Sequence, residues 1–118
     1  MKTKFFPVFV LLTALVINGC KKSSKDTPAP VTATPGANEV FIQNTAFSPS
    51  SITVAVNTTV KWTNKDNLSH TVTSNTALFD SGIIGPSSGT YSHQFTTAGT
   101  FPYHCSIHSS MNGTVIVQ

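Results

Sequence analysis

The strongest constraint on the fold is a period-two pattern of apolar residues that begins near Asn38 and continues to the C-terminus. Six short segments place apolar or aromatic side chains at every second position: 40–43, 51–56, 59–64, 90–95, 100–105 and 113–118. These segments are rich in Val, Ile, Thr and aromatic residues, and runs of turn-forming residues separate them. No window shows a sustained helical period. The sequence therefore predicts an all-β antiparallel sandwich of about seven or eight strands over residues 38–118.

The N-terminus has the features of an export signal. MKTK is a positively charged start, and the run FFPVFVLLTALVI that follows contains 13 residues. A membrane-spanning helix needs about 20 apolar residues, so this run is short for a span and suits a signal peptide. We expect residues 1–19 to be that signal. An uncleaved anchor and an ordinary secretory signal are the alternatives.

The sequence INGC, which ends at Cys20, resembles a bacterial lipobox. The resemblance implies that Cys20 is lipidated and becomes the new N-terminus, which anchors the protein without a spanning helix. The segment that follows, up to residue 37, is rich in Lys, Ser, Thr and Pro, and we expect residues 20–37 to be the lipidated Cys and a flexible linker. The protein is then exported and anchored to a bacterial membrane, in the periplasm or at the cell surface. Lys21, in place of an Asp after the Cys, favours the outer membrane.

The charge of the chain is carried mainly by its N-terminal part. Seven Lys, no Arg and four acidic residues give a net charge of +3. From Asn38 onward there are only Lys61 and Lys65 against Glu39, Asp66 and Asp80, which gives 2 − 3 = −1. The domain has no basic stripe, so we expect no nucleic-acid partner.

The loop before the last predicted strand carries three potential metal ligands. Cys105, His108 and Met111 are spaced three apart, and alternation with Phe101 and Tyr103 points Cys105 inward at a strand end. If Cys20 carries the lipid, Cys105 has no partner for a disulfide. Thiolate and thioether are soft ligands and imidazole is borderline, which suits copper, whereas Ca²⁺ and Mg²⁺ prefer oxygen. Zinc accepts Cys and His, but structural zinc sites rarely use Met.

A trigonal site needs a second His, and the chain has three others. His104 is adjacent to Cys105 and so points to the opposite face of its strand. We expect it to be exposed. His93 lies in a strand among aromatic residues, where we expect a partly buried, hydrogen-bonded side chain. His70 lies where a polar loop, NKDNLS, meets the predicted strand HTVTS.

The stretch GTFPYHCSIHSSMNGTVIV, with VKWTNKDNLSHTV about 35 residues upstream, resembles the cupredoxins, small proteins with a blue (type 1) copper site. The resemblance covers residues 38–118 and implies a Greek-key sandwich that binds one copper. Carried over position by position, it implies His70, Cys105 and His108 in the trigonal plane and Met111 as a weak axial ligand. The short spacing between His108 and Met111 is that of the amicyanin-like branch.

Two positions depart from the family pattern. Thr71 stands where the family often has an Asn whose side chain helps to hold the Cys loop, and Ile107 stands where a Pro often precedes the second His. Both changes leave the ligand set intact. They put in question how stiff the loop is and what reduction potential the site has.

The resemblance implies an electron-transfer protein rather than an enzyme. His108 would be the electron port, surrounded by an uncharged docking patch of Ile107, Ser109, Ser110 and Pro86, and His104 could mark a second exit. We expect a monomer with transient redox partners. The rival function is a copper carrier or store that uses the same ligands, although the chain is poor in Met. A sandwich without copper would leave the Cys–His–Met spacing unexplained, and a Cys–His nucleophile would lack an orienting group.

Overall fold

A computed structural model describes residues 33–118. The predicted signal peptide, Cys20 and most of the predicted linker lie outside the described residues, so the boundaries at residues 19 and 37 stay predictions. Among residues 33–118 no helix is long and apolar enough to cross a membrane.

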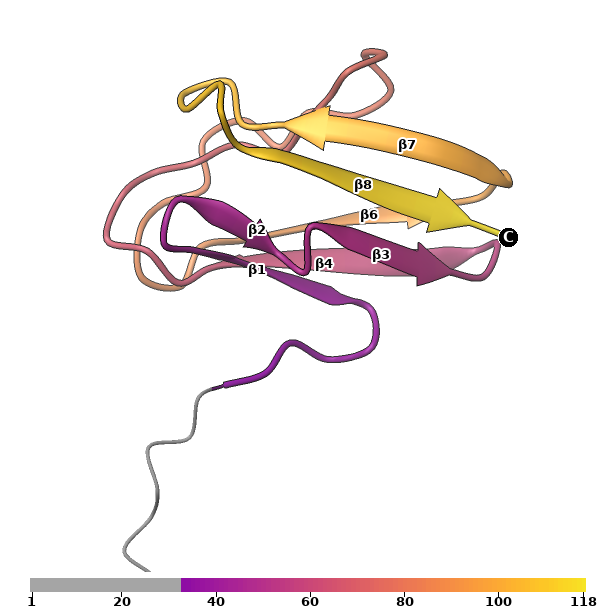
Figure 1. Ribbon diagram of the computed structural model, residues 1–118, viewed down its shortest axis with the longest axis horizontal. Helices are drawn as coiled ribbons and strands as arrows, with labels where there is room; N and C mark the ends of the chain where they lie inside the picture. Colours follow the sequence, from indigo (N-terminus) through magenta and orange to yellow (C-terminus); the bar gives the residue numbers. More distant parts are fainter. Residues whose placement is uncertain (1–32) are drawn as a thin grey trace, which may run out of the picture. The chain divides into compact units, whose positions relative to one another are not determined.

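The described residues form eight strands in two four-stranded sheets (Figure 1). The first sheet has the order β2-β1-β4-β6 and the second has the order β3-β8-β7-β5. The strands are β1 (Glu39–Gln43), β2 (Ala46–Ser48), β3 (Ser51–Val54), β4 (Thr58–Asn64), β5 (Thr73–Ser74), β6 (Thr90–Phe95), β7 (Gly99–His104) and β8 (Asn112–Val117). The predicted all-β sandwich is confirmed, and each of the six alternating segments contains a strand. The short strand β2 was not predicted.

The pairing of the strands is mixed rather than purely antiparallel. β1 runs parallel to β4, and β3 runs parallel to β8, while the other pairs are antiparallel. The reason is the path of the chain: after the β1–β2 hairpin it crosses to the second sheet as β3 and returns to the first sheet as β4, beside β1. Alternation of side chains assigns the faces of a strand but not the direction of its neighbours, so the sequence pattern did not specify these two pairs.

Trp62 lies at the centre of the core between the sheets and is fully buried. The Tyr103 ring meets it edge-on, with centroids 5.4 Å apart and an interplanar angle of 84°. Phe95, Tyr91 and Phe79 surround the same indole ring. Phe95, Phe79 and Tyr103 are buried in this core, whereas Tyr91 is partly buried and packs against it. Phe79 comes from the long connection between β5 and β6. It is not part of an alternating apolar pattern, so the sequence did not predict its burial.

One end of the sandwich gathers the segments that carry the candidate ligands (Figure 1). Here β7 ends, and the Cys105 amide donates to the Met111 carbonyl at 3.1 Å, which closes the loop into β8. The β1–β2 turn is at the same end, because the amides of Asn44 and Thr45 donate to the Asp66 carboxylate. We call this the site end. The C-terminus of β8 lies at the opposite end.

Candidate metal centre

Three donor atoms converge at the site end. The Cys105 Sγ lies 3.9 Å from His70 Nδ1 and 3.8 Å from His108 Nδ1, and all three atoms lie within 4.8 Å of one another. Donors at about 2.0 Å (N) and about 2.3 Å (S) from one ion, at trigonal angles, would be roughly 3.7 Å apart. The donor set therefore fits a single metal ion. A thiolate with two imidazoles is a soft-to-borderline set that suits copper.

His70 is held from two sides. Its backbone exchanges two hydrogen bonds with Ile84, and its Nε2 lies 2.9 Å from the Asp66 Oδ2. Because Nε2 bonds the carboxylate, Nδ1 is left to face Cys105. Partial burial would raise the pKa of Asp66, but the amides of Thr45 and Asn44, together with His70, outweigh it and hold the pKa below its usual value. The carboxylate is thus in the ionised form, which accepts a hydrogen bond from the His70 Nε2–H.

Asn64 is a fully buried amide that joins the segments on either side of His70. Its Nδ2 donates to the carbonyls of Leu68 at 2.8 Å, Gly85 at 3.0 Å and Ile84 at 3.2 Å. Its Oδ1 accepts the Asp66 amide at 3.0 Å. One side chain at the end of β4 therefore fixes both the loop that carries Asp66 and the strand-like segment that pairs with His70.

Cys105 is fully buried, and its sulfur receives a hydrogen bond of 3.3 Å from the Thr71 amide. The Thr71 hydroxyl accepts the Ser106 amide at 2.8 Å and lies 3.0 Å from the Ser106 hydroxyl. Thr71 thus links the two ligand-bearing loops through both its backbone and its side chain. The departure from Asn at this position does not leave the Cys loop untied.

His108 and Met111 occupy the loop between β7 and β8. The Met111 amide donates to the His108 carbonyl at 2.9 Å, which makes a tight turn, and Met111 is 2% exposed. His108 is partly exposed, and its ring lies against that of His70 with centroids 4.9 Å apart. The loop brings Met111 into the core at the site end. Its role as an axial ligand stays a prediction.

The other two histidines lie outside the cluster. His104 is partly exposed on the opposite face of β7, as alternation predicts, and its Nδ1 lies 2.6 Å from the Asn75 Oδ1. His93 is partly buried, and its ring packs against Phe79 and Phe95. Burial lowers the pKa of His93.

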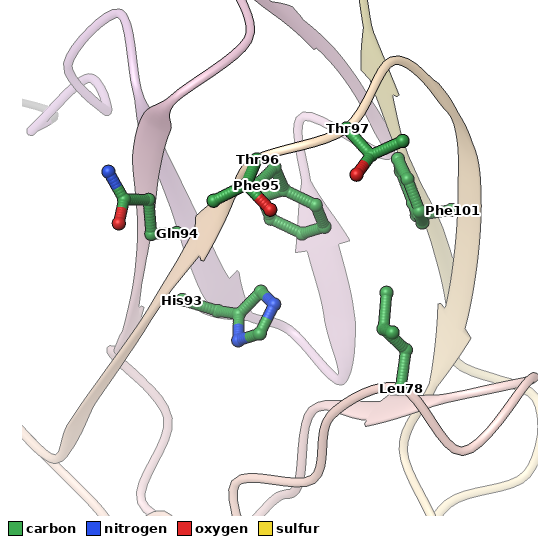
Figure 2. Close-up of a pocket in the computed structure, with 7 residues that line it drawn as sticks. All are labelled: Leu78, His93, Gln94, Phe95, Thr96, Thr97 and Phe101. Atoms are coloured by element: carbon green, nitrogen blue, oxygen red, sulfur yellow. The ribbon is translucent and has the colours of Figure 1, made fainter.

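A cavity of about 400 Å³ lies beside β6. Figure 2 shows His93 pointing into it. Leu78 and Phe101 face it from the other side. The cavity is lined by Leu78, His93, Gln94, Phe95, Thr96, Thr97 and Phe101. None of these residues belongs to the donor cluster, so the cavity is separate from the candidate metal centre.

Two residues that orient the donors, Asn64 and Asp66, were not among the predicted site residues. Asn64 and Asp66 were assigned only to a strand end and a polar loop. A signal was present for Asp66, which is an acidic residue four positions before the candidate ligand His70. The role of Asn64 depends on contacts with residues 84 and 85, which are 20 and 21 positions away and which no local sequence pattern predicts.

The fold and the site together define a β-sandwich protein with a single-ion centre of two His and one Cys at one end. Comparison with known proteins agrees: the model of the cupredoxin-like domain family matches residues 8–117, and the chain belongs to this family. It is 31% identical over 115 residues to amicyanin-alpha of Methylorubrum extorquens, which covers 90% of this chain and 87% of the relative.

Solved structures show the same likeness. A purple cupredoxin from Nitrosopumilus maritimus superposes with a TM-score of 0.62 and 28% identity, over 68% of this chain and 98% of that protein. A mutant of amicyanin in its Cu(I) form superposes with a TM-score of 0.65 and 31% identity, over 70% of this chain and 83% of the other.

We predict that Asn64→Ala destabilises the metal-free protein by roughly 2–4 kcal/mol, because it removes the side-chain amide that bonds the Leu68, Ile84 and Gly85 carbonyls and opens a cavity. Urea unfolding gives the free energy of unfolding. Asn67→Ala is the matched control, since Asn67 is exposed in the same loop and should change stability by less than about 0.5 kcal/mol. A loss in Asn64→Ala no larger than in the control would contradict the role given to Asn64.

Proposed function

We propose that this protein transfers electrons with one copper ion that cycles between Cu(II) and Cu(I). His70, Cys105 and His108 would form the trigonal set, with Met111 as the weak axial ligand. The observation that carries the proposal is the convergence of a buried thiol and two imidazole nitrogens at separations of 3.8 and 3.9 Å. The copper would supply the one-electron redox change, and the protein would hold its ligands.

The way the ligands are held supports electron transfer over metal transport. His70 is fixed by Asp66 and by its backbone bonds to Ile84, and the sulfur of Cys105 is fixed by the Thr71 amide. Ligands that are already in place change little when the charge of the ion changes, so little energy is needed for reorganisation. A carrier that must release its metal gains nothing from such rigidity. The copper carrier or store remains the rival function.

The exposure of the ligands supports His108 as the electron port. His70 and Cys105 are fully buried, whereas His108 is partly exposed. We define the site-end patch as the exposed residues Leu68, Ile83, Pro86, Ile107, Ser109 and Ser110, which lie in the loops that carry or pair with the candidate ligands. Leu68, Ile83 and Ile107 are apolar and are 49%, 75% and 48% exposed. Exposed apolar side chains in the same loops as a partly exposed imidazole suit a small, transient contact with a redox partner.

The N-terminal features add location to the proposal. We infer that the protein is exported and that Cys20 carries a lipid that anchors it to a bacterial membrane. β1 runs toward the site end, because the turn that follows it binds Asp66. The chain therefore enters β1 at the end of the sandwich opposite the site end.

Copper loading tests the proposed site. With Cu(II), we expect an intense visible absorption band and a narrow copper hyperfine splitting in the EPR spectrum, because the thiolate bond to Cu(II) is strongly covalent. Cys105→Ser should abolish the band. Met111→Leu should keep the copper and shift the reduction potential. A protein that holds Cu(I) tightly and that no oxidant converts to the coloured form would favour the carrier.

Electron self-exchange tests the site-end patch without a known partner, since two copies must meet through it. Ile107→Lys should slow self-exchange about fourfold at low salt, because two added charges about 5 Å apart in water cost roughly 0.8 kcal/mol. Leu78→Lys adds the same charge beside the separate cavity and should leave the rate unchanged. NMR line broadening in mixtures of Cu(I) and Cu(II) protein measures it. Equal slowing in both variants would place the contact elsewhere.

Membrane fractionation tests the anchor. The full chain should sediment with membranes, and Cys20→Ser should move it to the soluble fraction or leave it unprocessed. A chain found with membranes and processed equally in both forms would rule out Cys20 as the lipid attachment site.

A further inference from the structure

A row of hydrogen-bonded side chains runs from the Cys105 loop to the surface. The Ser106 amide donates to the Thr71 Oγ1 at 2.8 Å, and the Ser106 hydroxyl lies 3.0 Å from the same atom. The Thr71 Oγ1 lies 3.0 Å from the Thr73 Oγ1, which donates to the Asp80 Oδ1 at 3.3 Å. Thr71 is buried, Thr73 is partly exposed and Asp80 is exposed. The row therefore joins a surface carboxylate to the residue directly after Cys105.

The chemistry of the groups decides which side chain donates and which accepts in each hydrogen bond of this row. An ionised carboxylate can only accept hydrogen bonds, so the Thr73 hydroxyl must donate to Asp80. The Thr73 hydroxyl has one proton, which it donates to Asp80, so it can only accept a hydrogen bond from the Thr71 hydroxyl. The Thr71 hydroxyl donates its one proton to Thr73, so its lone pairs are left to accept from the Ser106 amide and hydroxyl. Each hydroxyl thus serves as an acceptor on the side of the Cys loop.

The backbone holds Asp80 beside Thr73 independently of these side chains. Thr73 and Asp80 are paired in a β-bridge. On either side of them, the Ser74 amide donates to the Phe79 carbonyl at 2.9 Å and the Ser81 amide donates to the Val72 carbonyl at 3.0 Å. Loss of one hydroxyl in the row therefore leaves the hairpin of residues 72–81 in place.

We propose that Asp80 is a positioning residue for the Cys105 loop and acts through Thr73 and Thr71. Its carboxylate orients both hydroxyls so that the Ser106 amide always meets an acceptor. Thr71 also donates its own amide to the Cys105 sulfur. A Thr71 side chain that is held in one orientation therefore helps to hold the Cys105 thiol in place. The proposed effect of Asp80 on the Cys105 loop requires no metal. An effect of Asp80 on a bound copper would in addition require the proposed function.

Asp80 has a second contact that offers a simpler role. Its Oδ1 also accepts the Gly82 amide at 2.9 Å, so it could serve only to close the turn at residues 80–82. Thr73→Val separates the two roles. It removes the middle hydroxyl, keeps a β-branched residue in β5, and leaves the bond between Asp80 and Gly82 untouched.

Amide hydrogen exchange at Ser106, in the metal-free full chain, tests the proposal. Thr71→Val, Thr73→Val and Asp80→Ala should each speed exchange at Ser106 about fivefold or more, which corresponds to roughly 1 kcal/mol, the worth of one hydrogen bond. Asp80→Asn keeps an oxygen acceptor and should retain most of the protection. Thr53→Val on β3, an exposed position, is the control and should change nothing. None of the four sites adjoins Ser106 in sequence, so intrinsic exchange is unaltered.

Faster exchange in Thr71→Val alone would overturn the proposal, because the row would then end at Thr71. Faster exchange in Asp80→Ala but not in Thr73→Val would assign Asp80 to the turn only, and equal loss in Asp80→Asn and Asp80→Ala would overturn its role as an acceptor. In the copper-loaded protein, Thr73→Val should also change the copper hyperfine splitting while Thr53→Val does not. Failure to bind copper would defeat the proposed function and leave the exchange result standing.

Discussion

The candidate metal centre depends first on the contact between Thr71 and the Cys105 loop. His70 and Cys105 are 35 positions apart and lie in different loops, so the sandwich alone does not set their separation. Thr71 follows His70 directly, and it donates its amide to the Cys105 sulfur and accepts the Ser106 amide. Backbone and side chain of one residue thus tie the first ligand to the second. Movement of either loop would break two hydrogen bonds at a buried position, which is costly.

Behind this contact lie the fully buried amide of Asn64 and the partly buried carboxylate of Asp66, which bond loop segments rather than the sheets. Asn64 is fully buried and satisfies three carbonyls and one amide. Asp66 accepts two backbone amides and orients His70. Such groups are stable in an apolar interior only when their bonds are complete. The site end therefore has little freedom to rearrange, which is what a centre that gains and loses one electron requires.

The sequence predicted the parts of this structure that repeat and missed the parts that depend on the path of the chain. Alternation gave six strand segments, and it placed Cys105 inward and His104 outward. It could not reveal the parallel pairs β1·β4 and β3·β8, because direction is set by where the chain crosses between sheets. The candidate donors could be recognised in the sequence because soft metal ligands at such short spacing are rare. Asn64 and Thr71 act across 20 and 35 residues, and contacts at that range leave no local pattern.

The remaining feature of the site end is its asymmetry. Two of the three converging donors are fully buried, and the third, His108, is partly exposed. Under the proposed function a partner would dock over His108, because electron transfer weakens steeply with distance and His108 is the one donor of the three that is partly exposed. The site-end patch holds no charged residue that would steer or repel a partner. Contact there would rest on uncharged groups, which favours brief encounters, and brief encounters allow rapid turnover of an electron carrier.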